Sequence, residues 1–138
     1  MYSCIKSSLI QGIDTIPISV EVDVSTGMPV FDMVGYLASE VKEAKERVKT
    51  SLHNCGISLP AKRITVNMSP GNIRKKGTSF DLPIAVGLLC ALGIIEQNKV
   101  DDYLFFGELR CRDFVGCKMN EMLLHLSFRE FFECRVVL

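Results

Sequence analysis

A strict alternation of branched hydrophobic and polar residues over positions 16–24 is the feature that most limits the fold. Isoleucine or valine stands at every second position, and proline, serine, glutamate and aspartate stand between them. Because successive side chains of a β-strand point to opposite faces, this period predicts a strand with one buried face. Residues 2–10 predict a partner strand, joined to it by a turn at 11–14, so we expect a hairpin.

Two further short runs, 29–35 and 63–69, predict a third and a fourth strand. Between them the period becomes helical, with hydrophobic residues three or four positions apart: Val41, Ala44, Val48 and Leu52. Lysines and glutamates cover the other side of this helix. We interpret them as a solvated face rather than a nucleic-acid contact, because the two signs are interleaved.

The ends of this helix carry their own signals. We expect Ser39 to be its N-cap and Gly56 to end it. Glu43 and Arg47 stand four residues apart in the order that favours an ion pair along a helix.

A long apolar run, 82–95, predicts a core helix. Two glycines and Pro83 interrupt the run, and it falls short of the roughly 20 residues that a membrane span needs. Ser79 or Asp81 can cap the first turn, where Pro83 is tolerated and the carboxylate of Asp81 suits the positive end of the helix dipole.

The remaining segments complete an α+β pattern. A polar connection, 96–102, leads to a predicted short strand at 103–109, then to a helix at 118–132 and the start of a strand at 134–138. We therefore expect one domain over residues 1–138, with a mixed, curved sheet backed by helices. The chain stops inside a strand pattern, which suggests a fragment of a longer protein; a short native edge strand is the alternative.

Composition limits the classes of function. Sixteen basic and sixteen acidic residues cancel, so any charge-driven binding must be local. Six cysteines form no C-x-x-C pair, and neither histidine has zinc-ligand spacing, so we expect no metal site. Scattered thiols and an N-terminus without a signal-peptide core suggest the reducing cytoplasm.

The loop before the apolar helix, "SPGNIRKKGTS", carries three consecutive cations: Arg74, Lys75 and Lys76. It is not a P-loop, because five residues separate Gly71 from Gly77 and the lysines precede the second glycine. Exposed cations beside a helix start would attract an anion such as a nucleic-acid phosphate. An ordinary solvated loop remains the simpler account, since three cations are a small footprint for a DNA binder.

A third interpretation of the same loop is nucleophilic catalysis. Ser79 on a turn at a helix start could be activated by a lysine whose pKa is lowered by burial, and Lys118 is the lysine we would nominate. One serine and one lysine are a weak signal, because both occur in almost any chain.

Several long segments in a fixed order resemble the N-terminal domain of the magnesium-chelatase-like ComM/YifB family of AAA+ ATPases, which are linked to competence and DNA processing. They are "IPISVEVDVSTGMPVFDMVGY", "VKEAKERVKTSLHNCGISLPAKRITVNMSPGNIRKKG", "FDLPIAVGLL" and "FFGEL", and they cover about residues 1–109. The resemblance implies a fold related to the Lon protease domain and to the second domain of a small-subunit ribosomal protein.

In that family an ATPase module follows this domain, binds ATP and magnesium, assembles into rings and is thought to act on branched DNA. None of that module is in this chain, and nothing here looks like a porphyrin site. The signature of the family at this place is Phe-Asp-Leu-Pro-Ile-Ala, which is matched by Phe80, Asp81, Leu82, Pro83 and the two residues that follow.

The carry-over from Lon-type peptidases is incomplete. Ser79 falls where their serine lies, but this position varies in the ComM/YifB pattern, and Lys118 is only approximately in register with their lysine. After Leu109 the family continues with a hairpin rich in arginine, proline and glycine, whereas this chain departs from that pattern.

The resemblance thus implies a non-catalytic accessory domain that needs no cofactor of its own and engages substrate or organises a ring. Its expected partners are its own ATPase module, further copies and DNA, with no membrane. The alternatives are a Lon-type Ser-Lys peptidase and a purely structural module. If the domain contacts DNA, we expect the contact at Arg74, Lys75 and Lys76.

Overall fold

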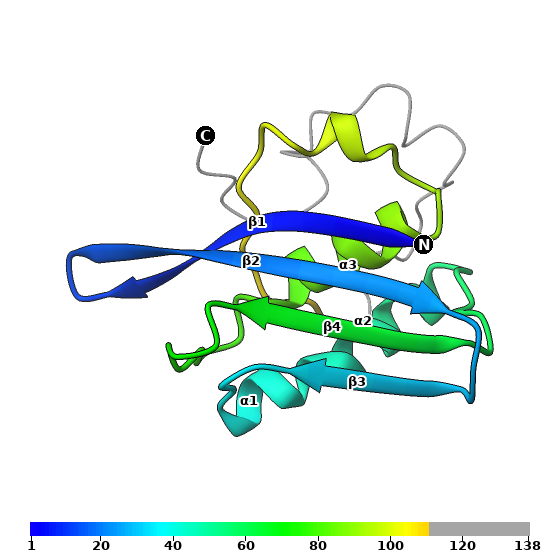
Figure 1. Ribbon diagram of the computed structural model, residues 1–138, viewed down its shortest axis with the longest axis horizontal. Helices are drawn as coiled ribbons and strands as arrows, with labels where there is room; N and C mark the ends of the chain where they lie inside the picture. Colours follow the sequence, from blue (N-terminus) through cyan, green and yellow to red (C-terminus); the bar gives the residue numbers. More distant parts are fainter. Residues whose placement is uncertain (111–138) are drawn as a thin grey trace.

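The computed structural model describes residues 1–110, which form a four-stranded mixed sheet with helices packed against it (Figure 1). The strands are β1 (Tyr2–Gln11), β2 (Asp14–Ser25), β3 (Val30–Val34) and β4 (Arg63–Ser69), in the spatial order β1-β2-β4-β3. The helices are α1 (Ser39–Lys42), α2 (Ala44–Asn54), α3 (Asp81–Ala91) and the 3-10 helix η1 (Gln97–Lys99). The α+β class with a mixed sheet backed by helices is confirmed.

The N-terminal hairpin is confirmed in its strands, its turn and its buried face. β1 and β2 pair antiparallel from Tyr2 opposite Asp23 to Gln11 opposite Asp14. Ile18, Val20, Val22 and Val24 are buried, as the two-residue period predicts. β4 pairs antiparallel with β2 and parallel with β3, so α1 and α2 form the crossover between two parallel strands.

The predicted amphipathic helix is present but divided at Glu43 into α1 and α2. Its buried stripe is confirmed, since Val41, Ala44, Val48 and Leu52 are almost fully buried. Gly56 ends α2 with a φ of 81°, a value that glycine adopts without strain.

The expectation that Ser39 caps this helix is wrong. Ala38 stands at the N-cap with extended backbone and no side-chain cap, and Ser39 is the first residue of α1. The reason is a backbone pairing, because the Ala38 N–H donates to the carbonyl of Lys75 at 2.9 Å and fixes the chain just before the helix.

α3 is the central helix of the core, and ten of its eleven residues are buried. Neither Ser79 nor Asp81 caps it, contrary to expectation, since Phe80 stands at the N-cap without a side-chain hydrogen bond. Asp81 is its first residue, and its carboxylate is used elsewhere. Gly87 lets the helix approach the sheet, because a Cβ at this position would lie 2.7 Å from a methyl carbon of Val22.

The predicted strand at 103–109 is wrong. Its pairing is limited to one isolated bridge, between Lys6 and Leu104. Beyond it the backbone turns to the start of α3, where the Gly107 N–H donates to the Ser79 carbonyl at 2.7 Å and the Gly107 carbonyl accepts from Leu82 at 3.0 Å. These hydrogen bonds replace the ladder that a strand would need. The helix expected at 118–132 and the strand at 134–138 lie outside the described residues.

Within residues 1–110 no helix is long and apolar enough to cross a membrane.

Candidate functional site

The cationic loop is fixed by backbone pairing to the segment before α1. The Lys75 N–H donates to the Tyr36 carbonyl and the Lys75 carbonyl accepts from Ala38, both at 2.9 Å. Residue 75 therefore lies in a short extended stretch, in which neighbouring side chains point to opposite sides. The Lys75 side chain points inward, and Arg74 and Lys76 are exposed.

Lys75 is fully buried, so the expectation of three exposed neighbouring cations does not hold for it. Its Nζ donates a hydrogen bond to the Pro70 carbonyl, which closes the loop on itself. Burial lowers the pKa of the Lys75 amine, because removal of water disfavours the charged form. The exposed charge of this loop comes from Arg74 and Lys76.

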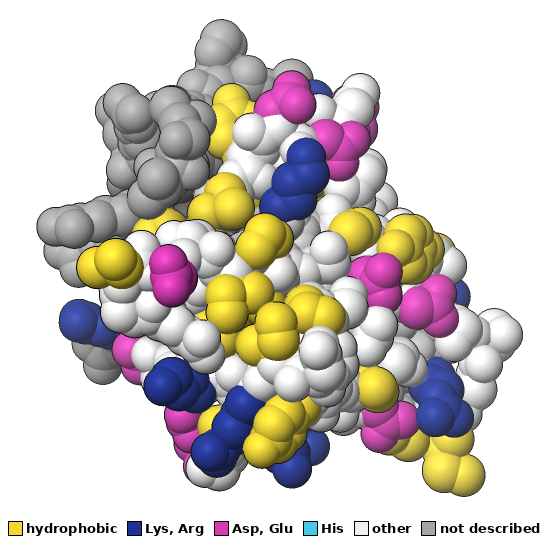
Figure 2. Space-filling view, turned by 60° about the vertical axis from the view of Figure 1, so that its left-hand side comes forward, with side chains coloured by type: hydrophobic (Ala, Val, Ile, Leu, Met, Phe, Trp, Pro, Cys, Tyr) yellow, Lys and Arg dark blue, Asp and Glu magenta, His cyan; other side chains and the backbone are white. Residues whose placement is uncertain are grey.

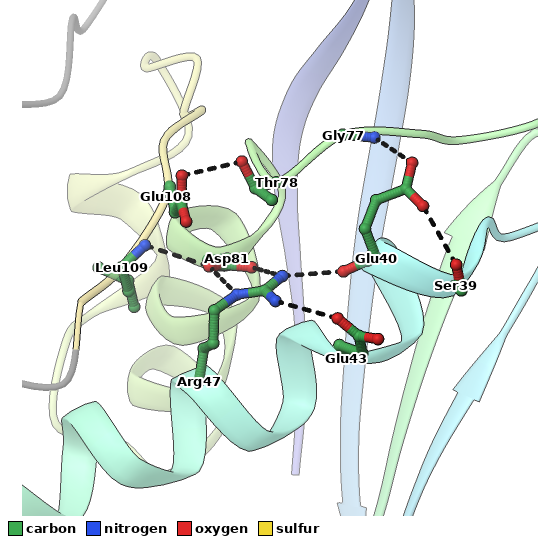
Figure 3. Close-up of polar contacts among 9 residues, drawn as sticks. All are labelled: Ser39, Glu40, Glu43, Arg47, Gly77, Thr78, Asp81, Glu108 and Leu109. Carbon is green, nitrogen blue, oxygen red and sulfur yellow. Dashed lines mark hydrogen bonds and ion pairs between the residues drawn. The ribbon is translucent and has the colours of Figure 1, made fainter.

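A carboxylate from α1 contacts the same loop. Glu40 Oε1 accepts a hydrogen bond from the Gly77 N–H at 3.0 Å (Figure 3). This N–H is the first cause of the lowered pKa of Glu40, and the positive charge of Arg74 lowers it further. The other carboxylate oxygen accepts from the Ser39 hydroxyl at 3.4 Å.

Behind this loop lies a buried ion pair between α2 and α3. Arg47 Nε and Nη2 donate to the two carboxylate oxygens of Asp81 at 2.7 and 3.0 Å, and the Leu109 N–H donates to Oδ2 at 3.1 Å (Figure 3). Asp81 is fully buried, whereas the Arg47 side chain is 23% exposed. Arg47 also donates to the Glu40 carbonyl at 2.8 Å and lies 3.8 Å from the Glu43 carboxylate, so the predicted Glu43 pair is confirmed.

Burial raises the pKa of Asp81 above that of an ordinary aspartate, and the hydrogen bonds from Arg47 and Leu109 oppose this shift. Asp81 in turn raises the pKa of the Arg47 guanidinium, chiefly through the hydrogen bonds that it accepts. Two-point contact with a planar guanidinium holds the carboxylate in one orientation. The pair thus fixes the start of α3 against α2.

Residues 107–110, at the end of the described part of the chain, are held next to this ion pair. The Thr78 hydroxyl donates to Glu108 at 3.0 Å, next to the Leu109 bond to Asp81 (Figure 3). The Ser51 hydroxyl on α2 donates to the Arg110 carbonyl at 2.6 Å. Residues 107–110 are therefore attached to α2 and to the start of α3.

The signature motif is a structural element in this fold. Phe80, Asp81, Leu82 and Pro83 are all buried, and both oxygens of the carboxylate accept hydrogen bonds from the protein itself. Ser79 is half-buried, and its carbonyl holds Gly107. Lys118 lies outside the described residues, so the Ser79 and Lys118 dyad stays a prediction.

Sequence reasoning missed the Arg47 partner of Asp81, the Glu40 contact and the burial of Lys75. One signal was available, because a lone aspartate at the head of an apolar helix needs a cationic partner if it is buried. The same reasoning had assigned Asp81 to the helix dipole instead.

Among residues 1–110, no group of three or more histidine, cysteine, aspartate or glutamate side chains is placed to hold a metal ion. Cys4 and Cys90 are free thiols. Burial raises the pKa of the Cys90 thiol to about 11, which makes it a poor nucleophile at neutral pH.

The sequence of the chain matches a known protein family. Residues 20–115 match the family described as subunit ChlI of Mg-chelatase. The chain is 45% identical over 98 residues to the uncharacterized protein YifB of Escherichia coli and 41% identical over 98 residues to the competence protein ComM of Haemophilus influenzae. It is 30% identical over 103 residues to the uncharacterized protein Rv2897c of Mycobacterium tuberculosis.

These matches cover 71% of this chain for YifB and ComM and 75% for the mycobacterial protein. They cover 19% of the first two relatives and 20% of the third. The chain thus spans about a fifth of the length of the curated relatives that it matches.

Proposed function

Since the chain belongs to the family of the Mg-chelatase subunit ChlI, we propose that it is a non-catalytic accessory domain of a ComM/YifB-type AAA+ ATPase that acts in DNA processing or competence. In this proposal ATP and magnesium are bound by an ATPase module of the full-length protein. The domain contacts that module and assembles with further copies of itself in a ring. It also helps the protein to bind DNA.

The observation that carries the proposal is the use made of Asp81. It is the one charged residue of the signature motif, and all its hydrogen bonds join α3 to α2 and to residue 109. A carboxylate that is fully buried and held by an arginine is unsuited to contact a substrate. Its position favours a scaffold role, in which it holds α2 and residue 109 to the start of α3.

DNA engagement is assigned to Arg74 and Lys76. Both are exposed on a loop whose backbone is pinned at Lys75, so they are held at a fixed place on the surface. Lysine and arginine side chains gather at the lower edge of the face in Figure 2, the side on which α1 lies in Figure 1. Cations on a rigid loop suit contacts to phosphates, which fix position without reading sequence.

The experiment is fluorescence anisotropy with a labelled four-way DNA junction over a range of salt concentrations. We expect the chain to bind the junction, and Arg74→Gln with Lys76→Gln to lower the salt slope by about 1.8, the effect of two lost phosphate contacts. The matched control is Lys42→Gln with Lys49→Gln, which removes the same charge from the exposed side of α1 and α2.

If the two double variants lower the salt slope of junction binding equally, a specific contact at the loop is contradicted, and only general electrostatic attraction remains. No junction binding by the unaltered chain would contradict DNA engagement by this domain and favour a purely structural module. Peptide cleavage that disappears on Ser79→Ala would contradict the non-catalytic role.

A further inference from the structure

The contact between Glu40 and the cationic loop has the geometry of an anion in a binding site. Its carboxylate oxygen accepts the Gly77 N–H at 3.0 Å, and the charge of Arg74 acts on the same carboxylate. A backbone N–H together with a nearby guanidinium is also the donor set that proteins offer to a phosphate oxygen. The position that an incoming phosphate would take is therefore filled by a side chain of the protein itself.

The loop does not need Glu40 to keep its shape. Lys75 fixes the loop by two backbone hydrogen bonds and by the bond from its buried amine to the Pro70 carbonyl. The Gly77 N–H, two residues further on, is thus presented at the surface whether or not a carboxylate covers it. Glu40 thus differs from Lys75, whose buried side chain holds the loop closed.

The Glu40 contact is also easy to displace. It lies at the surface, and the other oxygen of the carboxylate has only a long hydrogen bond from Ser39, at 3.4 Å. An exposed contact of a carboxylate is weak, because water solvates the free carboxylate and screens its charge. Its side chain can leave the loop without opening the core, since the buried neighbour Val41 carries the packing of α1.

We propose that the Glu40 carboxylate is an internal competitor that occupies the phosphate position of the loop at Arg74 and Gly77 and is displaced when DNA binds. The inference rests on the proposed function, because it takes the loop to be the DNA contact. It adds a regulatory residue on α1. The carboxylate lowers the affinity for DNA and favours substrates, such as the crowded phosphates of a branch point, whose negative potential is high enough to displace it.

The test compares Glu40→Ala with Glu46→Ala in the anisotropy assay with the four-way junction. Glu46 is exposed on α2, where it pairs with Lys49 at 3.9 Å, so its removal changes the net charge equally without touching the loop. We expect Glu40→Ala to tighten binding by about fivefold, the upper range for the loss of one exposed charge contact, and Glu46→Ala by less than about twofold. Glu40→Gln keeps the side chain and loses the charge, so it should tighten binding to an intermediate degree.

A second arm separates this inference from the function on which it rests. In a chain that already carries Arg74→Gln and Lys76→Gln, we expect Glu40→Ala to act no more strongly than Glu46→Ala, because the loop contact is gone. If the loop variants weaken binding but Glu40→Ala and Glu46→Ala are equal in the unaltered loop, the competitor is refuted and the DNA contact stands. If the loop variants bind like the unaltered chain, both proposals fall.

Discussion

Removal of Arg47 tests how much the buried ion pair with Asp81 contributes to the free energy of unfolding. In Arg47→Met the carboxylate of Asp81 keeps the hydrogen bond from Leu109 but loses both bonds from the guanidinium, at 2.7 and 3.0 Å, while it stays fully buried. Removal of one partner of a buried pair destabilises a protein by about 3–5 kcal/mol, because the other charge is left without compensation. We expect the lower end, about 3 kcal/mol, since Arg47 is 23% exposed.

The chain contains a matched control in the exposed pair of Arg63 and Asp32. Its atoms are 3.1 Å apart, and its side chains are 56% and 40% exposed. Arg63→Met removes the same chemical group as Arg47→Met, but water can solvate the carboxylate that remains. We expect a cost of at most about 1 kcal/mol.

The assay is urea unfolding followed by circular dichroism at pH 7 and at pH 5. With a slope of about 2 kcal/mol per molar urea, the Arg47→Met variant should unfold about 1.5 M earlier than the unaltered chain, and Arg63→Met less than about 0.5 M earlier. Asp81→Asn added to Arg47→Met should recover more than half of the loss, because the amide oxygen still accepts from Leu109 and no buried charge remains.

The pH dependence has a definite sign. Without Arg47 the desolvation of Asp81 is less opposed, so the pKa of its carboxyl in the folded chain rises further above its unfolded value. A raised carboxyl pKa gives stability at low pH that is lost as the pH rises through the folded value. The difference in the free energy of unfolding between Arg47→Met and the unaltered chain should therefore be smaller at pH 5 than at pH 7. Equal costs for Arg47→Met and Arg63→Met, or a gap that widens at pH 5, would refute the reasoning.

Three further results are expected from the packing and the burial. Gly87→Ala should destabilise the chain by about 1–3 kcal/mol in thermal unfolding, because its Cβ would lie 2.7 Å from Val22, whereas Gly71→Ala, with open space around it, should change little. Alkylation of the Cys90 thiol, followed by peptide mass mapping, should quicken about tenfold per pH unit from pH 8 towards its pKa of about 11, and a plateau near pH 8 would contradict this burial. Burial lowers the pKa of Lys75, so stability in urea should rise with pH up to about 10.5, the unfolded value, and this rise should be smaller in Lys75→Met; an identical rise in both would be the contrary result.

The parts of the fold that sequence could predict are those set by local period. The alternation at 16–24 and the helical spacing of Val41 and Val48 gave the correct buried faces, because each pattern allows one element type to bury its apolar side chains. The early start of α1 was missed, since it depends on the pairing of Ala38 with Lys75, which is far along the chain. The break at Glu43 was also missed, and no contact among the described residues explains it.

Partners distant in sequence also explain the errors at the site. Arg47 and Asp81 are 34 positions apart, and Glu40 and Gly77 are 37 apart, so no spacing rule joins them. Lys75 appeared to be one of three equivalent cations because neighbouring residues look alike in composition. Its extended backbone places the three side chains on alternate sides, which only the pairing with Tyr36 reveals.

The most direct test of the account is an amide chemical-shift map of the chain titrated with a four-way DNA junction. The account predicts that the largest changes occur at Arg74, Lys76 and Gly77, and that the Glu40 side chain leaves the Gly77 N–H. It also predicts little change at Asp81, which stays buried with Arg47. Changes centred on the exposed face of α2, with the 74–77 loop unaffected, would contradict it.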